Sequence, residues 1–276
     1  MKHPSTIISF FLLFTIPAII VAIFHSDPSE DTDSYTLVWS DEFESDTLNT
    51  DIWIPWEGGA YNNEQQCYTS REENLFIQDG KLHIRALDEQ YECGSSGIKP
   101  YTSARISTDS TAIGWEHGRF EAKIKMPAGI GFWPAFWMMP MREIGWPKGG
   151  EIDIMEYRGD QPTFTHAAAH YWRENCTGET RQCLNSEVST FDAENNLSEE
   201  FHIYALERTN DELRWSFNDE RIQTVSINDL PSDYDPFTGP FHIIINLAVG
   251  GDFLPNPDQS TPFPATMKVD YVRVYQ

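Results

Sequence analysis

The feature that most constrains the fold is a succession of short β runs, separated by turn signals, from Tyr35 to the end of the chain. Two hairpins are expected, one about Asp79-Gly80 and one about Asn218-Asp219. No segment of the sequence keeps a 3.6-residue apolar period over three turns. The sequence therefore predicts an all-β fold, an antiparallel β-sandwich. The expected strands are Leu75 to Leu87 and Leu213 to Ile227 (the hairpins), Tyr101 to Ser107, Arg119 to Met126, Phe132 to Met139, Glu151 to Tyr157, Thr165 to Trp172, Phe201 to Arg208, Phe241 to Val249 and Met267 to Tyr275.

The N-terminal segment is typical of a secretory signal. Lys2 precedes an apolar run from Ile7 to Phe24, and cleavage is expected near His25 or Ser26. The run is also nearly long enough to span a bilayer as an uncleaved anchor. We thus predict a signal peptide at residues 1–26, a polar linker at 27–34 and a single domain at 35–276, in a protein that is secreted to the exterior or periplasm, or membrane-anchored if uncleaved.

The formal net charge is −24, from 19 basic and 43 acidic residues spread along the chain. This charge argues against nucleic acid and anionic membrane surfaces as partners, because both would repel the protein. A neutral or cationic ligand is expected, although an adaptation for solubility or high salt would explain the charge equally well.

The four cysteines suggest disulfides in an exported chain. Cys176 and Cys183 enclose a short polar loop and are expected to pair. Cys67 and Cys93 are candidates for a second bridge, but the sequence leaves the connectivity open.

One expected strand carries three carboxylates. Alternation places Glu151 and Asp153 on one face and would bury the charge of Glu156 among apolar side chains, at a cost of several kcal/mol. A β-bulge near Ile154-Met155 would move Glu156 to the face of the other two acids. The two glutamate carboxyls could then approach to about 5 Å, the separation that retaining glycoside hydrolysis requires. The alternative is an exposed acidic strand with solvated carboxylates.

Aromatic side chains surround this strand. Four of the nine tryptophans lie close to it in the sequence, namely Trp133, Trp137, Trp146 and Trp172. Sugar rings stack on indoles, while their hydroxyls need polar partners. Candidates for such partners are Asn62, Asn63, Glu64, Arg105, His170 and Asn246. Core packing is the alternative for each indole, and it is favoured for Trp115 and Trp215.

Four segments together resemble family-16 glycoside hydrolases of the laminarinase type. They are Gly150 to Gly159, Gly131 to Met138, Tyr101 to Ile106 and Asp270 to Tyr275, and the resemblance runs from about Trp39 to the C-terminus. It implies a β-jelly-roll with an open concave substrate cleft, and retaining endo-hydrolysis of β-1,3-glucan. We also expect a monomer without a catalytic cofactor.

The resemblance also implies roles for individual residues. Glu151 would be the nucleophile, Glu156 the acid/base, and Asp153 a partner that tunes Glu151. Glycan contacts would come from Asn62, Arg105, Trp133, Trp137, His170 and Trp172. A structural calcium ion would be bound by backbone oxygens of Glu42 and Gly80 and by the carboxylate of Asp270.

Two other functions remain compatible with the resemblance. One is a non-catalytic β-glucan-binding protein on the same fold, although such proteins typically lack the glutamates found here. The other is a hydrolase of mixed-linkage β-1,3-1,4-glucan or of a sulfated galactan. The negative charge weighs against a sulfated polymer, and the inserted Met155 weighs against a dedicated mixed-linkage enzyme.

Overall fold

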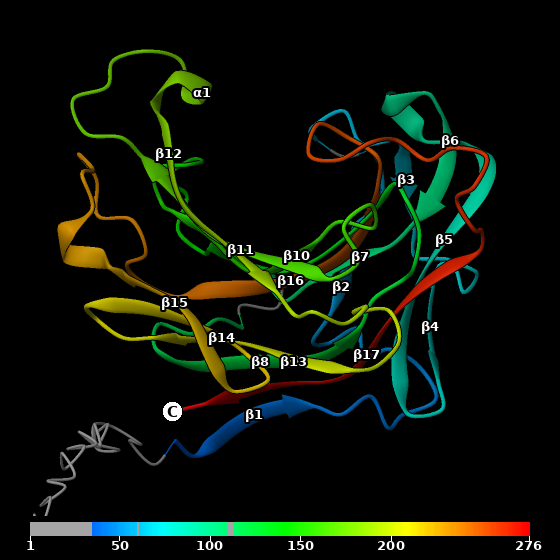
Figure 1. Cartoon of the computed structure of the whole chain (residues 1–276), viewed down its shortest axis with the longest axis horizontal. Helices are drawn as coiled ribbons and strands as arrows, with labels where there is room; N and C mark the ends of the chain where they lie inside the picture. Colours follow the sequence, from blue (N-terminus) through cyan, green and yellow to red (C-terminus); the bar gives the residue numbers. More distant parts are fainter. Residues whose placement is uncertain (1–34, 60, 110–112) are drawn as a thin grey trace, which may run out of the picture. The chain divides into compact units, whose positions relative to one another are not determined.

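The computed structural model describes residues 35–59, 61–109 and 113–276. The signal peptide and linker predicted for residues 1–34 lie outside this range. Within it, Tyr35–Gln276 form one unit that is built almost entirely of strands (Figure 1). The predicted all-β fold is confirmed. In the described part of the chain, no helix is long and apolar enough to cross a membrane.

The larger sheet has ten strands, in the order β15-β14-β13-β8-β17-β5-β6-β3, with β1 paired to β17 and β4 paired to β5. All of its pairs are antiparallel except β3 with β6. Its strands are β1 (Leu37–Asp41), β3 (Gln66–Tyr68), β4 (Leu75–Gln78), β5 (Lys81–Glu92), β6 (Ile98–Ser103), β8 (Gly118–Lys125), β13 (His202–Arg208), β14 (Glu212–Phe217), β15 (Glu220–Ser226) and β17 (Ala265–Tyr275).

The second sheet is antiparallel and has seven strands, in the order β12-β11-β10-β9-β16-β7-β2. In Figure 1 its central strands lie at the bottom of a curve whose sides rise at the left and at the right, and we call the concave side of this curve the hollow. Its strands are β2 (Ile54–Pro55), β7 (Arg105–Ser107), β9 (Phe132–Pro140), β10 (Glu151–Tyr157), β11 (Phe164–Trp172), β12 (Leu184–Asp192) and β16 (Phe241–Val249). The helix α1 (Thr180–Cys183) precedes β12, and the short 3-10 helices η1 (Gly94–Ser96) and η3 (Ile227–Asp229) lie in connections.

The apolar core fills the space between the sheets. The inward faces of both sheets contribute side chains with no solvent exposure, such as Phe120 and Trp215 from one sheet and Phe136 and Ile243 from the other. The outward face of the seven-stranded sheet is thereby left to carry the polar and aromatic residues of the hollow.

Most expected strands are present at the predicted places. Both hairpins are confirmed, with tight turns in which Asp79, Gly80, Asn218 and Asp219 all have positive φ. The expected strand Tyr101–Ser107 is instead two strands. It breaks at Ala104, so that β6 pairs within the large sheet and β7 pairs with β16 in the other.

Both candidate disulfides are present, Cys67–Cys93 and Cys176–Cys183, and they account for all four cysteines. The second bridge closes the loop between β11 and β12. This loop stands at one rim of the hollow with α1 (Figure 1).

Candidate active site

The predicted bulge is present in β10. The pairing of β10 with β9 shifts register between Asp153 and Met155, and its pairing with β11 shifts between Asp153 and Glu156. Met155 is fully buried in the core, while Glu151 and Glu156 retain partial exposure. The bulge therefore places the three acidic side chains on the hollow side of the strand, where all three line one cavity.

A residue from the opposite sheet holds the backbone at the bulge. The indole nitrogen of Trp215 on β14 donates a hydrogen bond of 2.9 Å to the carbonyl oxygen of Asp153. Trp215 is fully buried, as the sequence predicted, so this bond runs through the core. The regular hydrogen bonds between β10 and its neighbouring strands are interrupted at the bulge, and Trp215 supplies a partner for this carbonyl. A buried carbonyl without a partner would lower the stability of the fold.

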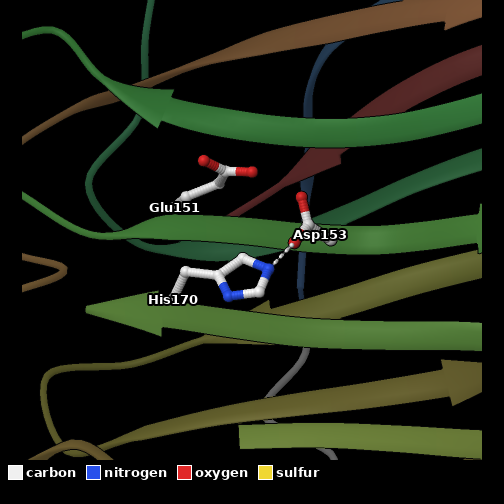
Figure 2. Close-up of side chains that lie close together, drawn as sticks. All are labelled: Glu151, Asp153 and His170. Atoms are coloured by element: carbon white, nitrogen blue, oxygen red, sulfur yellow. Dashed lines mark ion pairs between the residues drawn. The ribbon is translucent and has the colours of Figure 1, made fainter. Parts of the chain in front are cut away.

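His170 on β11 completes the acidic group. Its Nε2 lies 3.0 Å from a carboxylate oxygen of Asp153, and Glu151 lies beside this pair (Figure 2). Its Nδ1 lies 2.5 Å from the hydroxyl of Ser186 on β12. Nε2 therefore faces the Asp153 carboxylate and Nδ1 faces the Ser186 hydroxyl, and the two contacts together fix the orientation of the ring.

The environment favours the protonated carboxyls. Burial, followed by repulsion from Asp153, raises the pKa of both Glu151 and Glu156 to about 8. Burial raises the pKa of Asp153 to about 7. His170, the Trp146 indole and Arg105 oppose this for Glu151 and favour its ionised form. Because neighbouring carboxyls cannot all be ionised at once, some of them stay protonated. The group can then supply one ionised carboxylate as nucleophile and one protonated carboxyl as proton donor.

The two indoles of β9 contact the polar residues of the cavity. Trp133 donates a hydrogen bond of 3.0 Å from Nε1 to Glu156, and Trp137 donates one of 2.7 Å to Asn246. The Arg105 guanidinium lies 4.9 Å from the Trp137 ring centroid. Both indoles are half-buried and lie outside the core cluster. They are thus placed to present ring surface to a ligand.

The structure brings together most of the residues singled out from the sequence. The cavity is lined by Tyr61, Asn62, Glu64, Tyr68, Arg105, Trp133, Trp137, Glu151, Asp153, Glu156, Asn246 and Ala248. His170 joins them through Asp153. Trp172 does not line this cavity. The residue is 9% exposed, and its ring packs against Lys148 and Tyr234.

Sequence reasoning missed Tyr61, Tyr68 and Ser186. Tyr68 is buried and bridges two cavity residues, since it donates to Glu64 and accepts from Asn246. Its signal was weak because a buried tyrosine in a short strand resembles core packing. Ser186 gave no signal, because the strand that carries it, β12, was not predicted from the sequence.

Two of the residues expected to bind calcium already form ion pairs with basic side chains, and this arrangement does not suit a calcium ion. The carboxylate of Asp270 lies 3.2 Å from Lys81 Nζ and 2.8 Å from Lys123 Nζ. Glu42 forms a two-point ion pair with Arg273. Two ammonium groups would repel a calcium ion at the Asp270 carboxylate. The pairing of Asp270 with two lysines therefore weighs against the calcium ion that the resemblance implies, and no step of the chemistry depends on it.

Among the described residues, one carboxylate and imidazole group has a spacing that could hold a metal ion. Atoms of Glu151, Asp153 and His170 lie within 4.8 Å of one another. His170 and Asp153 lie within ion-pair distance of each other, and burial raises the pKa of Glu151 and Asp153, which suits carboxyls that exchange protons.

Paired carboxylates beside indoles are the arrangement expected of a hydrolase that acts on carbohydrate. Residues 36–276 match the family described as "Beta-porphyranase A-D, GH16 domain". The chain therefore belongs to glycoside hydrolase family 16, as the resemblance indicated.

Named relatives agree with this assignment. The chain is 38% identical to a "Beta-glucanase" of Rhodothermus marinus, over 91% of this chain and 88% of that protein. It is 36% identical to a "Glucan endo-1,3-beta-glucosidase" of Cryptopygus antarcticus, over 87% and 92%. The laminarinase catalytic domain of Thermotoga maritima superposes with a TM-score of 0.78 at 34% identity, covering 88% of this chain and 98% of that one.

Proposed function

We propose that the protein is a retaining endo-hydrolase of β-1,3-glucan. The observation that carries the proposal is the bulged strand, which places Glu151, Asp153 and Glu156 on one face beside two half-buried indoles. The relatives named as glucan endo-1,3-β-glucosidases support the choice of substrate.

In the proposed mechanism, ionised Glu151 attacks the anomeric carbon and forms a covalent glycosyl-enzyme. Protonated Glu156 gives its proton to the departing glycosidic oxygen. In the second step Glu156 takes a proton from water, and the water oxygen displaces Glu151. The raised pKa of Glu156 suits a proton donor, but the pKa of Glu151 is raised to the same value, so the division of roles rests on the family resemblance. The bond from Trp133 orients the Glu156 carboxyl.

Asp153 and His170 would act on Glu151 rather than on the sugar. Proton sharing between the neighbouring acids decides how much of Glu151 is ionised, since the charge of Asp153 raises the Glu151 pKa and that of His170 lowers it. Double displacement needs only these side chains and water, so no catalytic cofactor is proposed.

A second candidate is hydrolysis of a porphyran-type galactan. The description of the matching family names β-porphyranases, and this observation favours the candidate. The net charge of −24 disfavours a polyanionic substrate because the two would repel each other. Mixed-linkage glucan is a third polymer that the same carboxylates could cleave.

Product analysis with laminarin, lichenan, agarose and porphyran side by side tests these candidates. We expect laminarin to give a ladder of short oligosaccharides at the highest kcat/KM, and the Glu151→Gln variant to give none. Faster cleavage of porphyran or lichenan would reassign the substrate. Binding of laminarin without cleavage would identify a glucan-binding protein.

We also propose that the protein is exported and monomeric. Two disulfides persist in oxidising compartments, which supports export, and the high like charge on each copy disfavours self-association. The N-terminal residue of the mature protein distinguishes a cleaved signal from an anchor, and light scattering measures the oligomeric state.

A further inference from the structure

The disulfide-closed loop between β11 and β12 is firmly built at its base. Arg173 donates from its side chain to the carbonyl of Gln182, and its backbone nitrogen donates to the carbonyl of Cys183. Glu179 and Gln182 form reciprocal caps on α1, and Cys176 is bonded to Cys183. The position of Arg181 in α1 is therefore well defined.

Arg181 reaches a residue on the opposite rim. Its guanidinium lies 3.6 Å from the Oδ2 atom of Asp252, in the segment that follows β16. The other oxygen of Asp252 accepts a 2.7 Å hydrogen bond from Asn63, and its backbone nitrogen donates to the carbonyl of Asn62. Asp252 is thus held in place, with one oxygen directed to Arg181.

Strand pairing places the segments that carry the two partners of this ion pair at opposite ends of the central strands. The loop that carries Arg181 leaves β11 where His170 pairs with Glu151, at the start of β10. Asp252 follows the end of β16, where Val249 pairs with Phe132 at the other end of these strands. The two rims stand on opposite sides of the hollow in Figure 1, with the loop bearing α1 at the left and the segment after β16 at the right.

The Arg181–Asp252 ion pair lies near Glu156, the proposed acid/base. Gly251 and Phe253, on either side of Asp252, both lie close to Trp133. A Cβ on Gly251 would be 3.5 Å from that indole, and the Phe253 ring centroid is 4.9 Å from it. Trp133 in turn donates to Glu156. A chain bound in the cavity would pass beneath the Arg181–Asp252 pair.

We propose that residues 173–183 form a strap over the cleft, and that the Arg181–Asp252 ion pair is its latch. The strap retains a bound glycan and disfavours chains whose side branches cannot pass beneath it. The side chains of Arg181 and Asp252 are 79% and 45% exposed. A pair this exposed is weak and is screened by salt, so the latch opens readily. The inference rests on the proposed polysaccharide hydrolysis.

Dissociation of a bound oligosaccharide tests the latch independently of turnover. In the Glu151→Gln variant, the dissociation rate of laminarihexaose is followed by indole fluorescence. Adding Arg181→Ala is expected to raise this rate about fivefold, which corresponds to about 1 kcal/mol. Raising the salt concentration should speed dissociation from Glu151→Gln but not from the double variant.

Charge variants and a matched arginine complete the test. Arg181→Lys should restore most of the slow dissociation. Exchanging the charges, Arg181→Asp with Asp252→Arg, should restore it more fully than either change alone. Arg221 also forms an exposed ion pair, 3.4 Å from Glu207 on the other sheet, so Arg221→Ala should leave the rate unchanged. Equal, salt-independent rates with and without Arg181 would overturn the strap.

The preference for unbranched chains has its own measurement. The wild type should show a higher kcat/KM on linear β-1,3-glucan than on one bearing β-1,6 branches, and Arg181→Ala should reduce this ratio several-fold. An unchanged ratio would contradict the strap. If the wild type cleaves neither polymer, the proposed function fails, and the dissociation experiment is made with an oligosaccharide of the polymer it does cleave.

Discussion

Replacing Glu156 with Gln should stabilise the protein at alkaline pH while it removes activity. The pKa of Glu156 is raised from the ordinary 4.5 to about 8 because the folded protein buries this carboxyl beside Asp153 and Glu151. Folding therefore favours the protonated form. Stability linked to this group is fully present below pH 4.5 and is lost as the pH rises toward 8.

The magnitude follows from the size of the shift. Each pKa unit corresponds to 1.36 kcal/mol, so the shift sets an upper value of about 5 kcal/mol at pH 8. Repulsion within the trio is shared among three acids, and Glu156 keeps some solvent contact, so we expect a gain of about 2 kcal/mol. For a domain of this size, that gain raises Tm by about 4–8 °C. The amide still accepts the Trp133 bond.

Urea unfolding and thermal melts at pH 4, 6 and 8 measure the effect. The difference between Glu156→Gln and the wild type should be close to zero at pH 4 and largest at pH 8. An exposed carboxyl on the β14–β15 hairpin offers the control, and Glu220→Gln should leave the pH profile unchanged. A Glu156→Gln variant that is no more stable at pH 8, or is equally stabilised at pH 4, would refute the reasoning.

Three further predictions concern the chemistry and the ion pairs. Proton NMR of the first product should show the β-anomer, because the proposed double displacement inverts the anomeric carbon twice, and initial α-anomer would exclude this mechanism. Trp137→Ala should lower kcat/KM with only a modest change in Tm, since the ring lies outside the core, and a loss of about 3–5 kcal/mol with normal binding would assign it to the core. Calcium or a chelator should change Tm little, because Lys81 and Lys123 already neutralise Asp270, and a rise of several degrees with calcium would show that these lysines move aside.

The bulge in β10 could be predicted from the sequence, because a regular strand would have buried the charge of Glu156 among apolar side chains. Glu156 could not be buried as an ion, so a bulge was required, and the extra residue was found as predicted. The hairpins were equally predictable, because residues that tolerate positive φ mark their turns.

Contacts between distant segments could not be predicted in this way. Trp215 lies 62 residues from Asp153 in the sequence, and nothing in either strand indicates that they bond. The packing of Trp172 depends on Lys148 and Tyr234, which come from two other connections. The break at Ala104 sends consecutive strands into different sheets, although the local sequence reads as one β run.

The hydrogen bond from Trp215 holds β10, the strand that carries the catalytic carboxyls, from the core side. The rims of the cleft are built from separate loops. Changes in those loops can therefore alter which polymer enters without disturbing the spacing of the reacting carboxyls. The same anchor makes chemistry depend on the docking of the two sheets. A partly unfolded molecule in which the sheets separate would lose this support of the bulge, and we expect weaker catalysis from it even while each sheet kept its own hydrogen bonds.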